Sequence, residues 1–183
     1  MIPRLNEKYT TQVVPALTQR FGYTSPVAVP KIKKIVISMG IGDGHQDQAK
    51  MDLATKQLTL IAGQKPVVTK SKKAISNFKL RIGMKVGLMV TLRGARMYEF
   101  LDHLIALAIP RVKDFRGLSP SGFDGRGNYN MGLVEQTVFP EVDSSTVTFT
   151  QGMNIAMATS AQTDEEALEL LTLMGMPFRK DKV

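Results

Sequence analysis

The chain has 183 residues, of which 43% are hydrophobic and 22% are charged, a balance that suits one folded domain and excludes disordered and collagen-like chains. Because it has no cysteine and only two histidines, disulfide scaffolds, thiol catalysis and metal sites built from cysteine or several histidines are excluded. The formal net charge of +8 favours a polyanionic partner.

The first part of the chain predicts a helix followed by a strand. Apolar side chains recur at helical spacing through residues 4–20, and Pro15 predicts a kink or a division of that helix. From Lys31 to Met39, buried-type residues alternate with other side chains and β-branched residues are frequent. This second pattern is typical of a strand.

Three alternate glycines, Gly40, Gly42 and Gly44, follow this strand and raise the question of a dinucleotide-binding loop. A Rossmann fingerprint requires its third glycine one position later, where His45 stands. The chain also lacks a P-loop lysine motif and a nucleophile elbow. The glycines therefore indicate a turn, and His45, with aspartates nearby, indicates a polar loop rather than a general base.

The middle of the chain predicts a helix, a short extended segment and the clearest strand. Asp47 is placed to cap a helix that runs to about residue 61, and Gly63 follows its end. Residues 66–69 predict extended chain. Across residues 84–92, aliphatic side chains alternate strictly with small, polar or basic ones, which predicts a strand with one packed and one open face.

The next part predicts a helix, a loop and two strands. Residues 95–109 have the apolar spacing of a helix that Pro110 stops, and residues 111–130 are rich in glycine and short polar side chains. A loop of that length is uncommon unless it has a function, so we expect a functional loop at the surface. Residues 131–138 and 147–159 predict strands.

The last helix is specified at both of its ends. Residues 163–166 form a capping box, and Gly175 and Pro177 follow the helix. Helices and strands are interspersed along the chain, without a repeat or a sharp change in composition. We therefore expect an α+β fold, a single domain over residues 1–183, with a mainly antiparallel sheet, helices packed on one face and the other face open.

Basic and acidic residues are segregated along the chain. Residues 1–52 hold seven basic and four acidic side chains, residues 53–98 hold ten basic and none acidic, and residues 99–183 hold seven and twelve. The positive charges of the middle block repel one another, and no carboxylate within the block offsets this repulsion, so a bound anion is needed to neutralise it. The block therefore favours a phosphate backbone as partner over a merely solvated face.

The densest part of this block is residues 70–85. Its cations are interleaved with serine and asparagine, a mixture that contacts phosphates and sugars. Phe78 either contacts a base face or anchors the segment to the core. No zinc-finger spacing, heptad or RNP aromatic run is present, so recognition of folded RNA by shape and backbone is favoured over reading of DNA.

The residues alone leave two other protein classes open. An RNA-processing enzyme needs converging carboxylates or histidines, which the middle block lacks. A general polyanion or membrane-surface binder would take heparin, acidic vesicles and RNA alike. No apolar run reaches the ~18 residues of a membrane span, and the segment MIPRLNEKYTTQ lacks the apolar stretch of a signal peptide, so we expect an intracellular protein.

Long segments of the chain resemble one protein family. These segments are GQKPVVTKSKKAISNFKLRIGMKVGLMVTLRGARMYEFLDHL, IPRVKDFRGLSPSGFDGRGNYNMGLVEQTVFPE and TDEEALELLTLMGMPFRK. Together with RLNEKY and RFGY, they resemble the family of bacterial large-subunit ribosomal protein five, which binds 5S rRNA. The resemblance runs nearly from end to end.

That resemblance implies a structural protein of the cytoplasmic ribosome, with no enzyme activity and no cofactor or metal. The implied partners are 5S rRNA, 23S rRNA, the P-site tRNA, the other 5S-binding ribosomal proteins and small-subunit protein thirteen, with no membrane. The family offers the open face of its sheet to 5S rRNA in the central protuberance, which agrees with the two-sided strand predicted above.

The resemblance also assigns candidate residues to three contacts. The 5S rRNA contact falls on Lys33, Ser38, Gln64, Thr91 and Arg93, although family members often have asparagine where Ser38 stands. The extension toward the tRNA carries Lys70, Lys72, Lys73, Asn77, Phe78, Lys79, Arg81 and Lys85. The bridge to the small subunit carries Arg111, Lys113, Arg116, Glu141 and Asp143.

Overall fold

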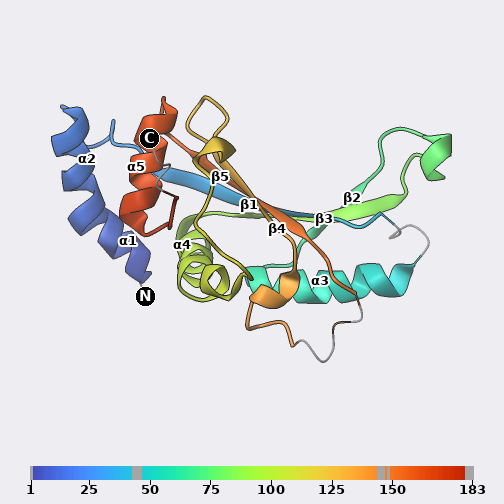
Figure 1. The fold of residues 1–183 in the computed structure, drawn as a ribbon. Coiled ribbons are helices and arrows are strands. Elements are labelled where there is room, and N and C mark those ends of the chain that lie inside the picture. Colours follow the sequence, from blue (N-terminus) through green and yellow to red (C-terminus); the bar gives the residue numbers. More distant parts are fainter. Residues whose placement is uncertain (1, 43–46, 144–146, 148, 180–183) are drawn as a thin grey trace. The chain divides into compact units, whose positions relative to one another are not determined.

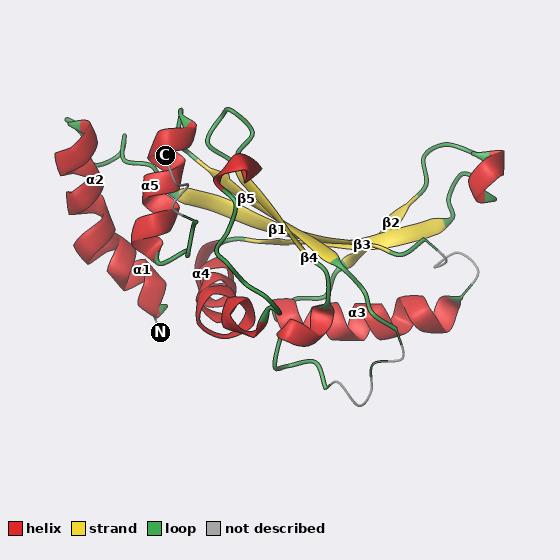
Figure 2. Cartoon of the chain, viewed as in Figure 1, coloured by secondary structure: helices red, strands yellow, loops and turns green. Residues whose placement is uncertain are grey.

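The computed structural model describes residues 2–42, 47–143, 147 and 149–179, and it has the predicted α+β fold (Figures 1 and 2). One five-stranded antiparallel sheet has the strand order β2-β3-β1-β5-β4. The strands are β1 (Ile32–Gly40), β2 (Val67–Lys70), β3 (Lys85–Leu92), β4 (Tyr129–Leu133) and β5 (Met153–Thr159). The α-helices are α1 (Arg4–Lys8), α2 (Val14–Phe21), α3 (Gln48–Ala62), α4 (Gly94–His103) and α5 (Asp164–Met174).

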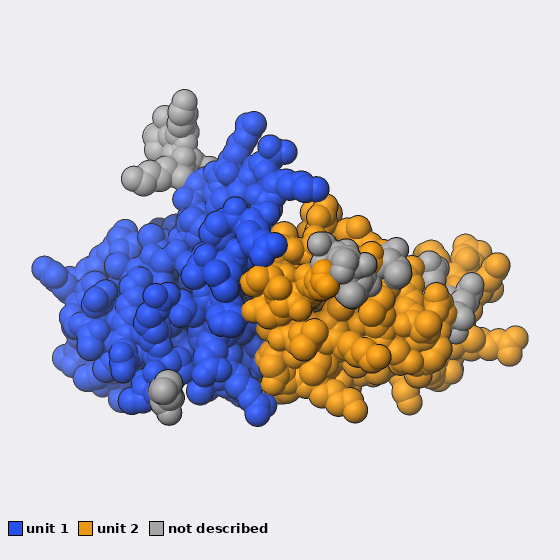
Figure 3. Space-filling model, turned by 90° about the horizontal axis from the view of Figure 1, so that it is seen from below, with its two compact units in different colours: residues 1–35, 92–131, 156–183 blue, residues 36–91, 132–155 orange. Residues whose placement is uncertain are grey.

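The chain divides into two compact units (Figure 3). Unit 1 comprises residues 1–35, 92–131 and 156–183, and unit 2 comprises residues 36–91 and 132–155. The strands β1, β3, β4 and β5 each contribute residues to both units. A single domain therefore remains our interpretation of the chain, and each unit is described by itself below.

In unit 2, α3 covers one face of the sheet (Figure 2). Its apolar side chains Met51, Ala54, Leu58 and Ile61 are buried, as are Leu88 and Val90 of β3. Both predicted ends of this helix are confirmed. The Asp47 carboxylate accepts a hydrogen bond from the backbone N–H of Lys50 at 3.0 Å, and Gly63 takes the left-handed conformation with φ of +62°.

In unit 1, the N-terminal helix accommodates Pro15. A π-helical stretch, Tyr9–Val13, separates α1 from α2, and Pro15 lies in the first turn of α2, where a missing N–H costs little. The prediction of a helix over residues 4–20 is thus confirmed, and the π-helical stretch before Pro15 divides it. A second π-helical stretch, Leu104–Ala108, continues α4.

The predicted cap of α5 is confirmed with one change. Thr163 Oγ1 accepts a hydrogen bond from the N–H of Glu166 at 3.3 Å. The Glu166 carboxylate accepts from the N–H of Gln162 at 2.9 Å, one residue before the position that a capping box requires. Gly175 ends the helix in the left-handed region with φ of +112°.

Two strand predictions are wrong at one end. The strand expected over residues 131–138 ends at Leu133, because the buried Gln136 lies in a 3₁₀ turn. The Gln136 side chain donates to the carbonyl of Phe149 at 2.8 Å and accepts from the N–H of Gln151. This amide satisfies backbone groups that a strand partner would otherwise pair, so β5 begins only at Met153.

Candidate nucleic-acid interface

The basic segment of residues 70–85 is a folded hairpin end. It continues the antiparallel pair of β2 and β3 in unit 2 (Figure 1). Beyond the strands, the N–H of Ser71 donates to the carbonyl of Met84 at 2.8 Å, and the N–H of Gly83 donates to the carbonyl of Ser71 at 3.0 Å. The backbone itself therefore holds the segment in one conformation, which the sequence pattern did not predict.

The tip of the hairpin is also closed by its own backbone. Ile75 and Leu80 exchange two N–H to carbonyl hydrogen bonds, each of 3.0 Å. Between them lies a 3₁₀ turn, Ser76–Phe78, and Lys79 follows in the left-handed region with φ of 52°. Binding by this tip loses less chain entropy than binding by a disordered loop would.

Most cations of the hairpin point into solvent. The exposed ones are Lys70, Lys72, Lys73, Lys79 and Arg81, and Asn77 is exposed beside them. Lys85 differs, because it is half-buried and its Nζ donates to Oε1 of Gln48 at 2.7 Å. Since the sequence has no carboxylate between residues 53 and 98, this surface attracts anions.

Large apolar side chains accompany these cations at the tip. The Phe78 residue is 68% exposed, Ile82 is 73% exposed and Ile75 is 42% exposed. Of the two roles open for Phe78, anchoring to the core is therefore wrong, and contact with a base face remains. The exposure of the two isoleucines was not predicted, because their spacing does not distinguish a hairpin tip from a packed strand.

Two candidate 5S contacts of unit 2, Ser38 and Thr91, lie on the open face of the sheet. In β1, Ile35, Ile37 and Met39 are buried while Ser38 is half-buried on the other side, which confirms the two-sided sheet. Thr91 is also half-buried, and Gln64 Nε2 lies 3.5 Å from the carbonyl oxygen of Thr91, to which it donates. Ser38, Gln64 and Thr91 thus belong to one compact unit.

The remaining candidates fall in separate groups. Lys33 and Arg93 are exposed residues of unit 1, and Arg93 directly precedes α4. The basic bridge residues Arg111, Lys113 and Arg116 are exposed in unit 1. The acidic bridge residues belong to unit 2, where Glu141 is half-buried and Asp143 is exposed.

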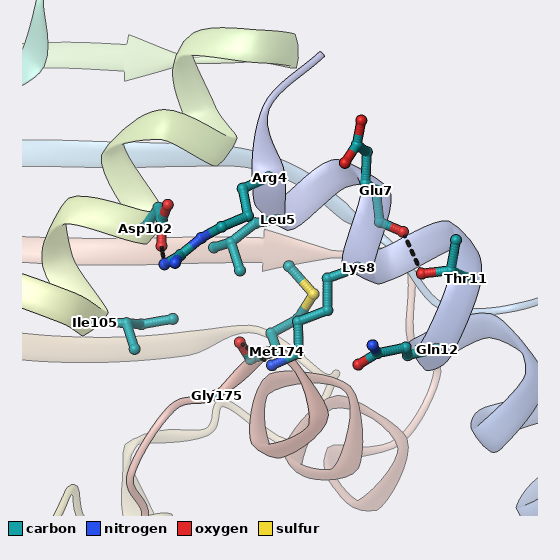
Figure 4. Close-up of a pocket in the computed structure, with 10 residues that line it drawn as sticks. All are labelled: Arg4, Leu5, Glu7, Lys8, Thr11, Gln12, Asp102, Ile105, Met174 and Gly175. Carbon is teal, nitrogen blue, oxygen red and sulfur yellow. Dashed lines mark hydrogen bonds and ion pairs between the residues drawn. The ribbon is translucent and has the colours of Figure 1, made fainter.

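A pocket of about 530 Å³ lies in unit 1 and is lined by Arg4, Glu7, Lys8 and Asp102 among others (Figure 4). Arg4 pairs there with Asp102 at 2.6 Å, and Lys8 Nζ donates to the carbonyl of Met174 at 3.2 Å. The described residues hold no group of three His, Asp or Glu side chains that could bind a metal ion. His45 and the neighbouring Asp43 lie outside the described residues.

The shifted pKa values belong to groups with structural roles. Burial raises the pKa of Tyr9 to about 12, and the Tyr9 hydroxyl donates to the carbonyl of Pro30 at 3.0 Å. Hydrogen bonds from the side chain of Asn128 and from the backbone N–H groups of Arg126 and Asn128 lower the pKa of Asp124.

Within the part of the chain that is described, no helix is long and apolar enough to span a membrane.

The chain is similar to known ribosomal proteins. Residues 25–81 match the family described as ribosomal protein L5, and residues 85–178 match the ribosomal L5P family C-terminus. The large ribosomal subunit protein uL5 of Brevibacillus brevis is 57% identical over 180 residues, which cover 98% of this chain and 100% of that protein. The uL5 protein of Ligilactobacillus salivarius is 55% identical with the same coverage.

Proposed function

The chain belongs to the ribosomal protein L5 family, and from that premise we propose that it binds 5S rRNA and helps to attach it in the central protuberance of the large ribosomal subunit. Membership makes it a structural constituent of the cytoplasmic ribosome and not an enzyme. The resemblance of the chain to this family is thereby confirmed.

One observation carries the proposal: the acid-free block of residues 53–98 contains β2, β3 and the pre-folded basic hairpin between them, and these two strands form part of the open sheet face. Thr91, Ser38 and Gln64 supply hydroxyl and amide groups that can bond the 2′-hydroxyls and base edges of RNA. Exposed Lys33 and Arg93 supply charge for phosphates. Each phosphate that they neutralise releases counterions, so the affinity falls as salt rises.

The hairpin serves a second RNA contact, with the tRNA in the P site. Its exposed cations lie on a tip whose backbone is already ordered, and Phe78 adds an aromatic face for a base. The same proposal includes contacts with 23S rRNA and with the other 5S-binding proteins. The exposed charges at Arg111, Lys113, Arg116 and Asp143, with Glu141, form the bridge to small-subunit protein thirteen.

Two groups of substitutions should separate the two RNA contacts. We expect the triple variant K72A/K73A/K79A to weaken tRNA binding more than 5S rRNA binding, because its charges lie at the hairpin tip. We expect T91A/R93A to do the reverse. Filter binding of both RNAs over a salt series measures this. For tRNA, the plot of log association constant against log salt has a negative slope, and the triple variant should make that slope shallower by about 2–3.

The variant R111A/K113A/R116A removes the same net charge from another surface and is the matched control. It should bind both RNAs as the unaltered protein does. Equal losses for both RNAs in the two test variants, or an equal loss in the control, would show that net charge rather than a particular surface determines binding.

A further inference from the structure

An apolar pair lies on the open face of unit 2 beside the polar candidates. Val67 of β2 is directly opposite Met89 of β3 in the antiparallel register. Val67 is 66% exposed and Met89 is 40% exposed, although both lie within strands. Side chains two residues apart on a strand share a face, so Met89 lies on the same face as Thr91.

The position on β3 next to this pair has no side chain. The adjacent register pair is Thr69 with Gly87. A Cβ atom at Gly87 would lie 2.5 Å from the carbonyl oxygen of Met39 and 3.1 Å from Oγ1 of Thr69, so only glycine fits there. The open face therefore presents the exposed pair Val67 and Met89 next to Gly87, which has no side chain, and its register partner Thr69.

We propose that the Val67–Met89 pair packs against ribose rings and base edges in the minor groove of 5S rRNA, as an apolar contact that salt does not weaken. This inference rests on the proposed function. The minor groove of an RNA helix is wide and shallow and displays 2′-hydroxyls and base edges, so exposed side chains on an open sheet face can reach it. Thr91, on the same face, is then placed to bond a 2′-hydroxyl.

The surroundings of the pair favour RNA over a protein as its occupant. Exposed Lys65 and Lys70 flank β2, and no carboxylate occurs anywhere in residues 53–98. A stable protein interface buries at least about 1,000 Å² around an apolar centre. Two side chains amid cations do not form such a centre, whereas they suit a polyanion that also presents C–H groups.

The test replaces each side chain by a polar one of similar shape, V67T and M89Q. Threonine keeps the branched form that favours a strand, and both positions are exposed, so the thermal unfolding midpoint should not change. In gel shifts, we expect the double variant V67T/M89Q to bind 5S rRNA about three- to tenfold more weakly, with an unchanged salt slope, since apolar contact area contributes without counterion release.

The matched control is L60Q, which makes an exposed leucine of α3 in the same unit polar and should bind 5S rRNA normally. Unaltered binding by V67T/M89Q, or a loss accompanied by a changed salt slope, overturns the inference. If the double variant binds RNA normally but no longer associates with another ribosomal protein, the pair contacts protein and the inference is wrong. If the unaltered chain itself does not bind 5S rRNA, the proposed function fails instead.

Discussion

Gly87 shows how one residue can shape the face of a sheet. Its missing side chain lets β3 approach the end of β1, where the carbonyl of Met39 occupies the place of a Cβ atom. The alternation of residues 84–92 predicted the strand and its two faces, but it could not show that position 87 tolerates no side chain. That constraint arises from a neighbouring strand that is distant in the sequence.

The substitution G87A therefore tests this packing. The added methyl group meets backbone rather than a flexible side chain, so the strand must shift, and we expect a loss of about 1–3 kcal/mol in the free energy of unfolding. Urea unfolding measures it. The control is G40A, since a Cβ at Gly40 has nothing within 4 Å and needs no left-handed backbone. Equal stability of G87A and G40A would refute the close approach.

At the scale of elements, the sequence predicted those helix ends that depend only on residues within or next to the helix. The ends of α3 and α5 follow from a capping side chain and a glycine within each helix's own sequence, and both are confirmed. The hairpin tip and the truncated strand after Leu133 were not predicted. Their conformations depend on backbone bonds between Ile75 and Leu80 and on the buried side chain of Gln136.

The loop predicted over residues 111–130 is held by hydrogen bonds to two carboxylates. The Asp124 carboxylate accepts from Asn128 Nδ2 at 2.7 Å and from the N–H groups of Arg126 and Asn128 at 2.9 and 3.1 Å. Asp164 at the start of α5 accepts from the N–H of Gly127 at 2.8 Å. These carboxylates replace hydrogen bonds that secondary structure would supply, which composition alone could not show.

The order of this loop should depend on pH. The hydrogen bonds hold the pKa of Asp124 below its usual range, so the ionised form stabilises the loop. The stabilisation is complete above the pKa of the unfolded chain and is lost as pH falls through the lower, folded pKa. We expect the backbone NMR shifts of Arg126 and Asn128 to titrate in that acid range in the unaltered protein and to lose this titration in D124N. The same titration in both proteins would contradict the assignment.

At the scale of the whole molecule, segregation of charge is the property that connects sequence with function. The acid-free block of residues 53–98 is followed directly by the acidic residues 99–183, and the block contains β2, β3 and the basic hairpin between them. Composition predicted a polyanionic partner, while 5S rRNA as that partner is what the family resemblance implies. The assignment of individual side chains to 5S rRNA, tRNA and the bridge remains a prediction.

The most direct test of the account is a gel shift of the purified full chain with 5S rRNA and with a tRNA of similar charge, at physiological ionic strength of about 0.15 M. We predict that the protein shifts 5S rRNA at a lower concentration than the tRNA, because the open sheet face adds contacts beyond phosphate attraction. Circular dichroism on the same sample verifies the fold. Equal affinity for the two RNAs, or no shift of 5S rRNA by the folded protein, would contradict the account.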